Sequence, residues 1–111
     1  MSWSLRRTAT AMIIAVAVAA STSCARQAPG AHVVHMKNIG FQPAELTVSR
    51  GDTIVWQNED FVPHTSTARD GSWDSKAINP DSSWRYVTDE AGQYDYYCVF
   101  HPNMVGKITV R

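Results

Sequence analysis

A short stretch near the C-terminal end of the chain carries three side chains that bind metals. Cys98, His101 and Met104 follow one another at the spacing Cys-x2-His-x2-Met, which brings a thiolate, an imidazole and a thioether close together. Sulfur donors combined with imidazole favour copper, and two histidines with one cysteine and a weak axial methionine describe a blue-copper electron-transfer site. The second imidazole must come from elsewhere, and His64 is the leading candidate. The sequence therefore predicts one copper ion, cycling between Cu(I) and Cu(II), bound by His64, Cys98, His101 and Met104.

Residues 1–24 have the pattern of an export signal. Arg6 and Arg7 precede an apolar stretch over residues 9–20, which is too short to span a bilayer comfortably. The arginine pair also invites a twin-arginine interpretation, although the residues after it are not the bulky apolar pair that such a signal prefers. We therefore expect an exported protein, in a bacterial periplasm or on the outer face of the cytoplasmic membrane, with no transmembrane span in its mature form.

Cys24 leaves two interpretations open. The run that ends in Cys24 resembles a bacterial lipobox, which would make Cys24 a lipid anchor and the first residue of the mature chain. Alternatively, ordinary signal cleavage near Ala25 removes Cys24. A disulfide between Cys24 and Cys98 is the least favoured option, because Cys98 is the predicted copper ligand and Cys24 lies outside the domain.

Residues 25–31 are predicted to form a linker, because they contain the turn-forming pair Pro29-Gly30. Residues 32–111 then make up the folded domain. A domain of that size is only marginally stable, and no disulfide is available within it, so a bound metal would add stability.

Short alternating runs separated by turn signals predict an all-β domain, a sandwich or a barrel. Ile54 and Trp56 alternate with more polar neighbours in one strand, and Tyr94, Tyr96 and Cys98 share a face in another. We expect the final strand to cover residues 105–110, after a loop that carries the ligands.

The residue pattern of these predicted strands is similar to that of a known family. The matching positions are Phe41-x-Pro43, Val48-x2-Gly51-Asp52-x-Ile54-x-Trp56-x-Asn58-x-Asp60, His64 and Gly92-x-Tyr94-x-Tyr96-x-Cys98-x2-His101-x2-Met104-x-Gly106. They resemble the plastocyanin/amicyanin group of the cupredoxins, the blue type-1 copper proteins. The resemblance implies a small cupredoxin-type Greek-key β-sandwich or barrel, with the short amicyanin-like ligand loop.

One position departs from that group. Thr65 stands where its members often have asparagine, whose side chain hydrogen-bonds near the cysteine loop. A hydroxyl can still donate a hydrogen bond there. Among the other polar residues, Glu59, Asp60 and Asp95 form no paired-carboxylate signature, and we expect them to be solvated charges.

The predicted function is that of an extracytoplasmic one-electron carrier, with no chemistry on a substrate. The alternative is a copper-binding module for copper delivery or buffering, but such modules use exposed Met- or His-rich tracts, which this chain lacks. Copper enzymes need further histidines beside the cysteine, where Tyr97 and Val99 stand, so we do not expect an enzyme. By the strand alternation Tyr97 faces outward, as a candidate second electron port.

The charge balance limits the partners. Ten Lys and Arg residues match ten Asp and Glu residues, so neither nucleic acid nor an anionic membrane surface is indicated. Apolar residues beside His101 indicate a small hydrophobic docking patch for a redox-protein donor and acceptor. Such patches suit transient complexes, and we expect the protein itself to be a monomer.

Overall fold

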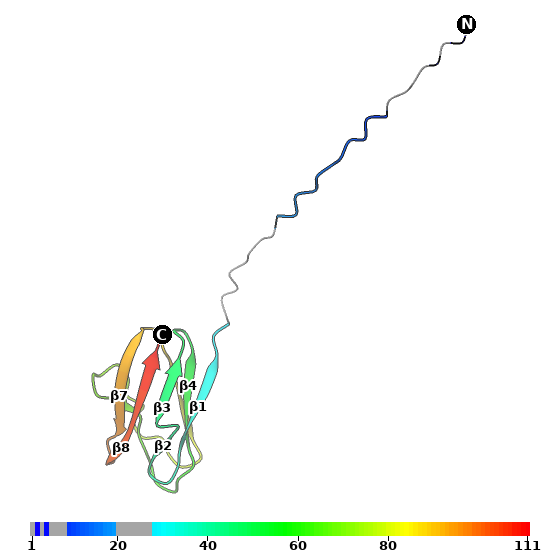
Figure 1. Ribbon diagram of the computed structural model, residues 1–111. Coiled ribbons are helices and arrows are strands. Elements are labelled where there is room, and N and C mark those ends of the chain that lie inside the picture. Colours follow the sequence, from blue (N-terminus) through cyan, green and yellow to red (C-terminus); the bar gives the residue numbers. More distant parts are fainter. Residues whose placement is uncertain (1, 3, 5–8, 20–27) are drawn as a thin grey trace.

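Figure 1 shows the computed structural model, which describes residues 2, 4, 9–19 and 28–111. The predictions made for Arg6, Arg7, Cys24 and residues 25–27 fall outside the described residues. Residues 9–19 are exposed and carry no helix or strand. Within the described part of the chain, no helix is long and apolar enough to cross a membrane.

The described residues form strands and no helix, as the alternating pattern predicts. The strands are β1 (Ala31–Met36), β2 (Phe41–Gln42), β3 (Glu45–Val48), β4 (Thr53–Asn58), β5 (Thr67–Ala68), β6 (Ser83–Val87), β7 (Gly92–Cys98) and β8 (His101–Val110). They pair in two four-stranded sheets, with the orders β2-β1-β4-β6 and β3-β8-β7-β5. β1 runs parallel to β4, and β3 runs parallel to β8, so each sheet joins strands that are distant in the sequence (Figure 1).

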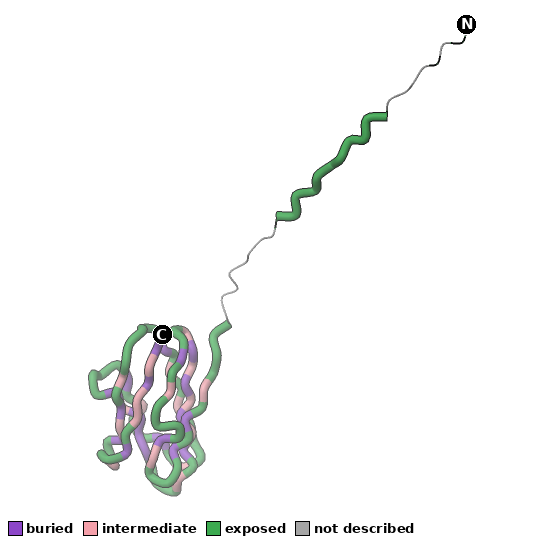
Figure 2. Tube along the Cα trace, in the orientation of Figure 1, coloured by how far each residue is buried: buried purple, intermediate pink, exposed green. Residues whose placement is uncertain are grey.

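The two sheets share one core. β4 contributes Ile54 and Trp56, and the opposite sheet contributes Tyr96 and Ile108, all fully buried. The rings of Trp56 and Tyr96 meet edge to face, with centroids 5.6 Å apart. Figure 2 shows the buried positions recurring along the strands between exposed ones. This alternation is the signature of sheets with one buried face, and it confirms the predicted all-β sandwich.

Gly106 has a packing reason to be glycine. A Cβ atom at this position would lie 2.5 Å from Cζ of Tyr96, whose side chain is fully buried. The missing side chain at Gly106 thus leaves room on β8 for the ring of Tyr96, a residue two positions before Cys98.

Asp52 ties the start of β1 to the turn before β4. Its carboxylate accepts hydrogen bonds from the backbone N–H of Gly30 at 2.8 Å, the ring Nε2 of His32 at 2.9 Å and the backbone N–H of Ser49 at 2.9 Å. These bonds, that from Gly30 foremost, lower the pKa of Asp52 to about 2. Because the folded-state pKa is depressed, this contribution to stability is present above pH 4 or so and is lost as the pH falls toward about 2.

The ligand region differs from the prediction in one respect. The final strand begins at His101 rather than at residue 105, and a tight turn of Val99 and Phe100 joins it to β7. Cys98 pairs with His101 and Tyr97 pairs with Val105, so residues 102–104 form a bulge on β8. A bulge bends its strand and re-aims side chains, and here Met104 is buried.

Candidate metal centre

His64 lies in the loop between β4 and β5 and is fully buried. Its backbone exchanges two hydrogen bonds with that of Ile78, at 3.1 and 2.7 Å. Asn58, at the end of β4, holds the same loop: its side-chain amide donates to the carbonyl oxygens of Val62 and Ile78, and its oxygen accepts the backbone N–H of Asp60. The loop therefore delivers the His64 imidazole to the interior at a fixed place.

Cys98 and His101 reach the same place from the other sheet. Cys98 is the last residue of β7 and His101 the first of β8, and the two face each other across the tight turn. The Cys98 thiol is fully buried, whereas His101 is partly exposed. The turn thus places one donor inside and one at the surface.

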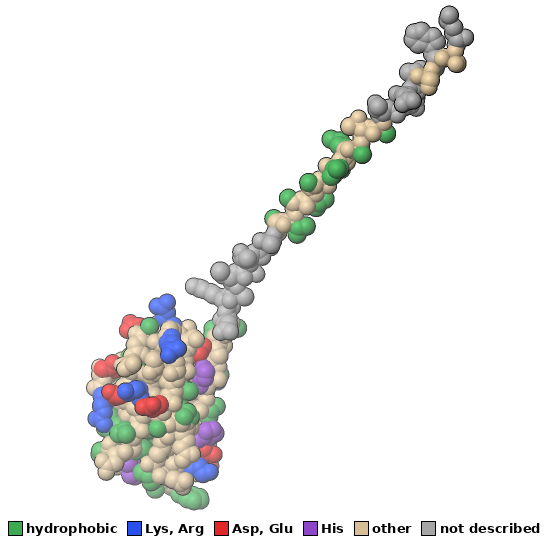
Figure 3. Space-filling view, in the orientation of Figure 1, with side chains coloured by type: hydrophobic (Ala, Val, Ile, Leu, Met, Phe, Trp, Pro, Cys, Tyr) green, Lys and Arg blue, Asp and Glu red, His purple; other side chains and the backbone are tan. Residues whose placement is uncertain are grey.

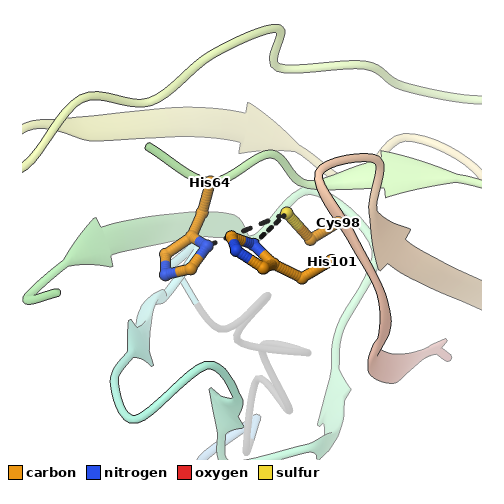
Figure 4. Close-up of side chains that lie close together, drawn as sticks. All are labelled: His64, Cys98 and His101. Carbon is orange, nitrogen blue, oxygen red and sulfur yellow. Dashed lines mark hydrogen bonds between the residues drawn. The ribbon is translucent and has the colours of Figure 1, made fainter. Parts of the chain in front are cut away.

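The three donor atoms converge. Cys98 Sγ lies 3.8 Å from His64 Nδ1 and 3.7 Å from His101 Nδ1, and the two imidazole rings are 5.0 Å apart at an angle of 66°. Figure 4 shows both rings next to the Cys98 sulfur. Sequence reasoning predicted all three residues as ligands, and the structure brings them together.

These distances fit a metal ion at the centre of the three atoms. Bonds of about 2.05 Å to nitrogen and about 2.3 Å to sulfur, at trigonal angles of about 120°, leave a nitrogen and a sulfur about 3.8 Å apart. The observed separations from Cys98 Sγ are 3.8 and 3.7 Å. Both sulfur–nitrogen separations are therefore those that a three-coordinate metal ion would require.

Asp60 orients the His64 ring. Its carboxylate lies 2.7 Å from His64 Nε2 and also accepts the backbone N–H groups of Asn38 at 2.8 Å and Ile39 at 2.9 Å. Because a carboxylate only accepts, His64 Nε2 carries the hydrogen and Nδ1 keeps a free lone pair on the side of Cys98. The expectation that Asp60 is a solvated charge was wrong: its side chain is largely buried.

The electrostatics of Asp60 agree with this role. Burial alone would raise the pKa of Asp60, but the hydrogen bonds from Ile39, His64 and Asn38 outweigh it and hold that pKa below its ordinary value. Asn38 and Ile39 have φ angles of 54° and 55°, a conformation that β-branched residues such as isoleucine rarely adopt. Backbone strain of this kind clusters at functional sites, and here it aims two N–H groups at one carboxylate.

Thr65 occupies the position of the family's asparagine and makes two contacts with the cysteine turn. Its backbone N–H points at Cys98 Sγ over 3.3 Å, and its side-chain oxygen accepts the backbone N–H of Val99 at 2.9 Å. The departure noted in the sequence therefore keeps a hydrogen bond to the turn, but the Thr65 hydroxyl accepts this bond, whereas donation was expected.

Met104 and an apolar surface lie next to His101. Met104 lines a hollow together with His101, Ile39 and Phe100. Exposed apolar side chains surround this end of the molecule, from the loops at residues 37–40, 59–63 and 99–100: Ile39, Phe61, Val62, Val99 and Phe100. Figure 3 shows hydrophobic side chains gathered at the end where β8 begins. We call these five residues the apolar rim.

Tyr97 lies on the outer face of β7, as predicted. Its ring is partly buried because the guanidinium of Arg69 covers it, 4.4 Å from the ring centroid. Sequence reasoning did not predict this cation–π contact.

Curated relatives share much of the chain. Amicyanin from Paracoccus denitrificans is 31% identical over 94 residues, which covers 80% of this chain and 72% of that protein. Amicyanin from Paracoccus versutus is 30% identical over 84 residues, and the match spans 64% of its length. Plastocyanin from Tetradesmus obliquus is 35% identical over 126 aligned positions, which cover 99% of this chain and 85% of that protein.

Solved structures of cupredoxins share the fold of this chain. A single-site variant of amicyanin in its Cu(I) form superposes with a TM-score of 0.70 at 31% identity, covering 76% of this chain and 85% of that one. A purple cupredoxin from Nitrosopumilus maritimus superposes with a TM-score of 0.67 at 30% identity, covering 72% of this chain and 99% of that one. The family model of the cupredoxin-like domain matches residues 9–110. The chain is a member of the cupredoxin family.

Proposed function

We propose that the protein is an extracytoplasmic one-electron carrier with a mononuclear type-1 copper site. His64, Cys98 and His101 would bind the copper, and Met104 would be a fourth, weaker ligand. The convergence of Cys98 Sγ with the Nδ1 atoms of both histidines, at 3.8 and 3.7 Å, is the observation that carries the proposal. Relatives named amicyanin and plastocyanin support the same role.

Bound copper would supply the couple between Cu(I) and Cu(II). The residues of this chain would keep the ligand geometry unchanged between the two states, so that little has to move when the electron moves. Asp60 holds the ring of His64, and the Thr65 N–H bonds to the cysteine sulfur. Both act on ligands that are themselves fully buried.

Copper delivery or buffering remains the second candidate. Burial favours the carrier, because a delivery protein must release its metal, whereas His64 and Cys98 are both 0% exposed. The rate of copper exchange distinguishes the two roles: a carrier retains its metal through many redox cycles. The relatives named amicyanin and plastocyanin are electron carriers, and we propose no catalytic activity.

We further propose that electrons pass through the partly exposed His101. The apolar rim around it suits a transient complex with a redox protein, because a small patch of this kind gives an interface below about 1,200 Å². The carrier would be a monomer, exported by the signal at residues 1–24 and either anchored through a lipid on Cys24 or released by cleavage near Ala25. Residues 25–31 would then link the N-terminus to the domain at residues 32–111.

Spectroscopy of the copper-loaded protein tests the proposal. The Cu(II) form is expected to be intensely blue, with a narrow copper hyperfine splitting in its EPR spectrum, because thiolate ligation produces both. Reduction by one electron should remove the colour and reoxidation should restore it. A copper-loaded protein that is colourless in its oxidised form would rule out the electron-carrier proposal.

The axial role of Met104 has its own test. Met104→Leu is expected to keep the copper and the blue colour while the reduction potential rises, because loss of an axial donor destabilises Cu(II) more than Cu(I). Leucine has nearly the same volume, so the buried position stays filled. Voltammetry measures the potential; a fall in potential or a loss of colour would show that Met104 is not the axial ligand.

A further inference from the structure

A chain of hydrogen bonds runs from the cysteine turn to the protein surface. The backbone N–H of Val99 donates to Thr65 Oγ1 at 2.9 Å, Thr65 Oγ1 lies 3.0 Å from Thr67 Oγ1, and Thr67 Oγ1 lies 3.3 Å from Asp74 Oδ1. Thr65 is buried, whereas the side chain of Asp74 is 40% exposed. These hydrogen bonds therefore connect Val99, the residue after Cys98, with the carboxylate of Asp74, which lies outside the metal centre.

The carboxylate fixes the direction of every bond in this chain. Asp74, ionised at neutral pH, can only accept, so the hydroxyl of Thr67 points its hydrogen toward Asp74. The oxygen of Thr67 is then free to accept the hydrogen of Thr65. As a result, Thr65 presents only lone pairs to the N–H of Val99, and each hydroxyl donates once.

Asp74 is itself held in place. It accepts the backbone N–H of Lys76 at 2.9 Å and the Lys76 ammonium at 3.0 Å. Its backbone forms a β-bridge with that of Thr67, and the backbone N–H of Ala68 donates to the carbonyl of Trp73 at 2.9 Å. The acceptor at the end of the chain thus has a fixed position relative to β5.

We propose that Asp74, acting through the Thr67 hydroxyl, is a positioning residue for the turn that carries Cys98. Thr65 contacts both Cys98 and the residue after it: its N–H donates to Cys98 Sγ, and its side-chain oxygen accepts the N–H of Val99. Without Asp74 the hydroxyl of Thr67 can turn its hydrogen toward Thr65, and the hydrogen of Thr65 then loses its acceptor and can turn toward the N–H of Val99. Residues that hydrogen-bond to the ligands of a metal, without touching the metal themselves, tune both the geometry and the electronics of a site.

The metal-free protein gives a readout that does not depend on copper. In Thr67→Val, which keeps the shape and removes the hydroxyl, the Val99 amide is expected to exchange its hydrogen about fivefold faster, the factor lost with one typical hydrogen bond. Thr67→Ser restores the hydroxyl and should restore protection. Thr109→Val, the same change on β8 outside the chain of hydrogen bonds, should leave the exchange of Val99 unaltered.

The copper-loaded protein tests the link to the sulfur, and this part rests on the proposed function. The reduction potential of Thr67→Val is expected to fall, because a weaker N–H bond to the Cys98 thiolate leaves more electron density to stabilise Cu(II). Asp74→Ala should lower the potential in the same way, whereas Asp74→Asn, whose amide oxygen can still accept from Thr67, should stay close to the wild type.

The two readouts keep the outcomes distinguishable. Unaltered exchange of Val99 in folded Thr67→Val and Asp74→Ala would overturn the positioning role, whatever copper does. Faster exchange without a change in potential would overturn the link to the sulfur. A protein that is not blue but shows the expected exchange would refute the proposed function and leave the positioning role standing. Should Thr67→Val fail to fold, Asp74→Ala decides by the same measurements.

Discussion

Cys98→Ser is expected to abolish the blue absorption and the narrow EPR splitting of the Cu(II) protein completely. The colour of such a site comes from charge transfer between the thiolate and Cu(II), and a serine hydroxyl supplies no comparable donor. Cys98 is fully buried at the end of β7, and serine is slightly smaller, so the strand pairing with β8 should survive. Absorption and EPR spectra of copper-loaded samples measure the effect, with thermal unfolding of the metal-free variant as the check on folding.

The chain contains its own matched control for this experiment. Cys24 is the other of its two cysteines and belongs to the predicted export signal. Cys24→Ser in the full-length chain should therefore leave the spectrum of the copper-loaded protein unchanged. A blue Cys98→Ser protein would mean that Cys98 is not the ligand, and the proposed copper site would have to be abandoned.

Much of the fold could be predicted because alternation is a local property of a strand. Ile54 and Trp56 alternate with partly exposed neighbours in β4, and the structure buries them as expected. The start of β8 could not be predicted in this way. Residues 102–104 form a bulge and break the alternation, so the pattern becomes readable only from Val105 onward.

The donors of the site could be predicted because copper chemistry restricts them to few residue types. Three donors lie within one short motif, and the remaining histidine had a single leading candidate. The residues that hold the donors could not be found in the same way. Asp60 meets Asn38 and Ile39 across more than 20 positions of sequence, and Thr65 meets Val99 across 34. Such contacts depend on which distant strands pair within each sheet and on how the loops between them fold, which no local pattern records.

Removal of the Asp60 carboxylate is expected to weaken copper binding about 10–100-fold, the range found when an outer partner of a metal-bound histidine is lost. Asp60→Ala deprives His64 Nε2 of its acceptor, and it also leaves the backbone N–H groups of Asn38 and Ile39 without one. Asp60→Asn retains one acceptor oxygen without the charge, so an intermediate loss is expected. Competition of the Cu(I) protein with a chelator measures the affinity.

Glu59 provides the matched control, because it is the adjacent carboxylate and also bonds a histidine. Its Oε2 lies 2.7 Å from Nδ1 of His35, but both side chains are exposed, 41% for Glu59 and 49% for His35. Exposed pairs of this kind contribute little, so Glu59→Ala should bind copper like the wild type. If Asp60→Ala also bound copper with wild-type affinity, the orientation of His64 would have to come from the backbone bridge to Ile78 alone. The strained turn at Asn38 and Ile39 would then have no role at the metal centre.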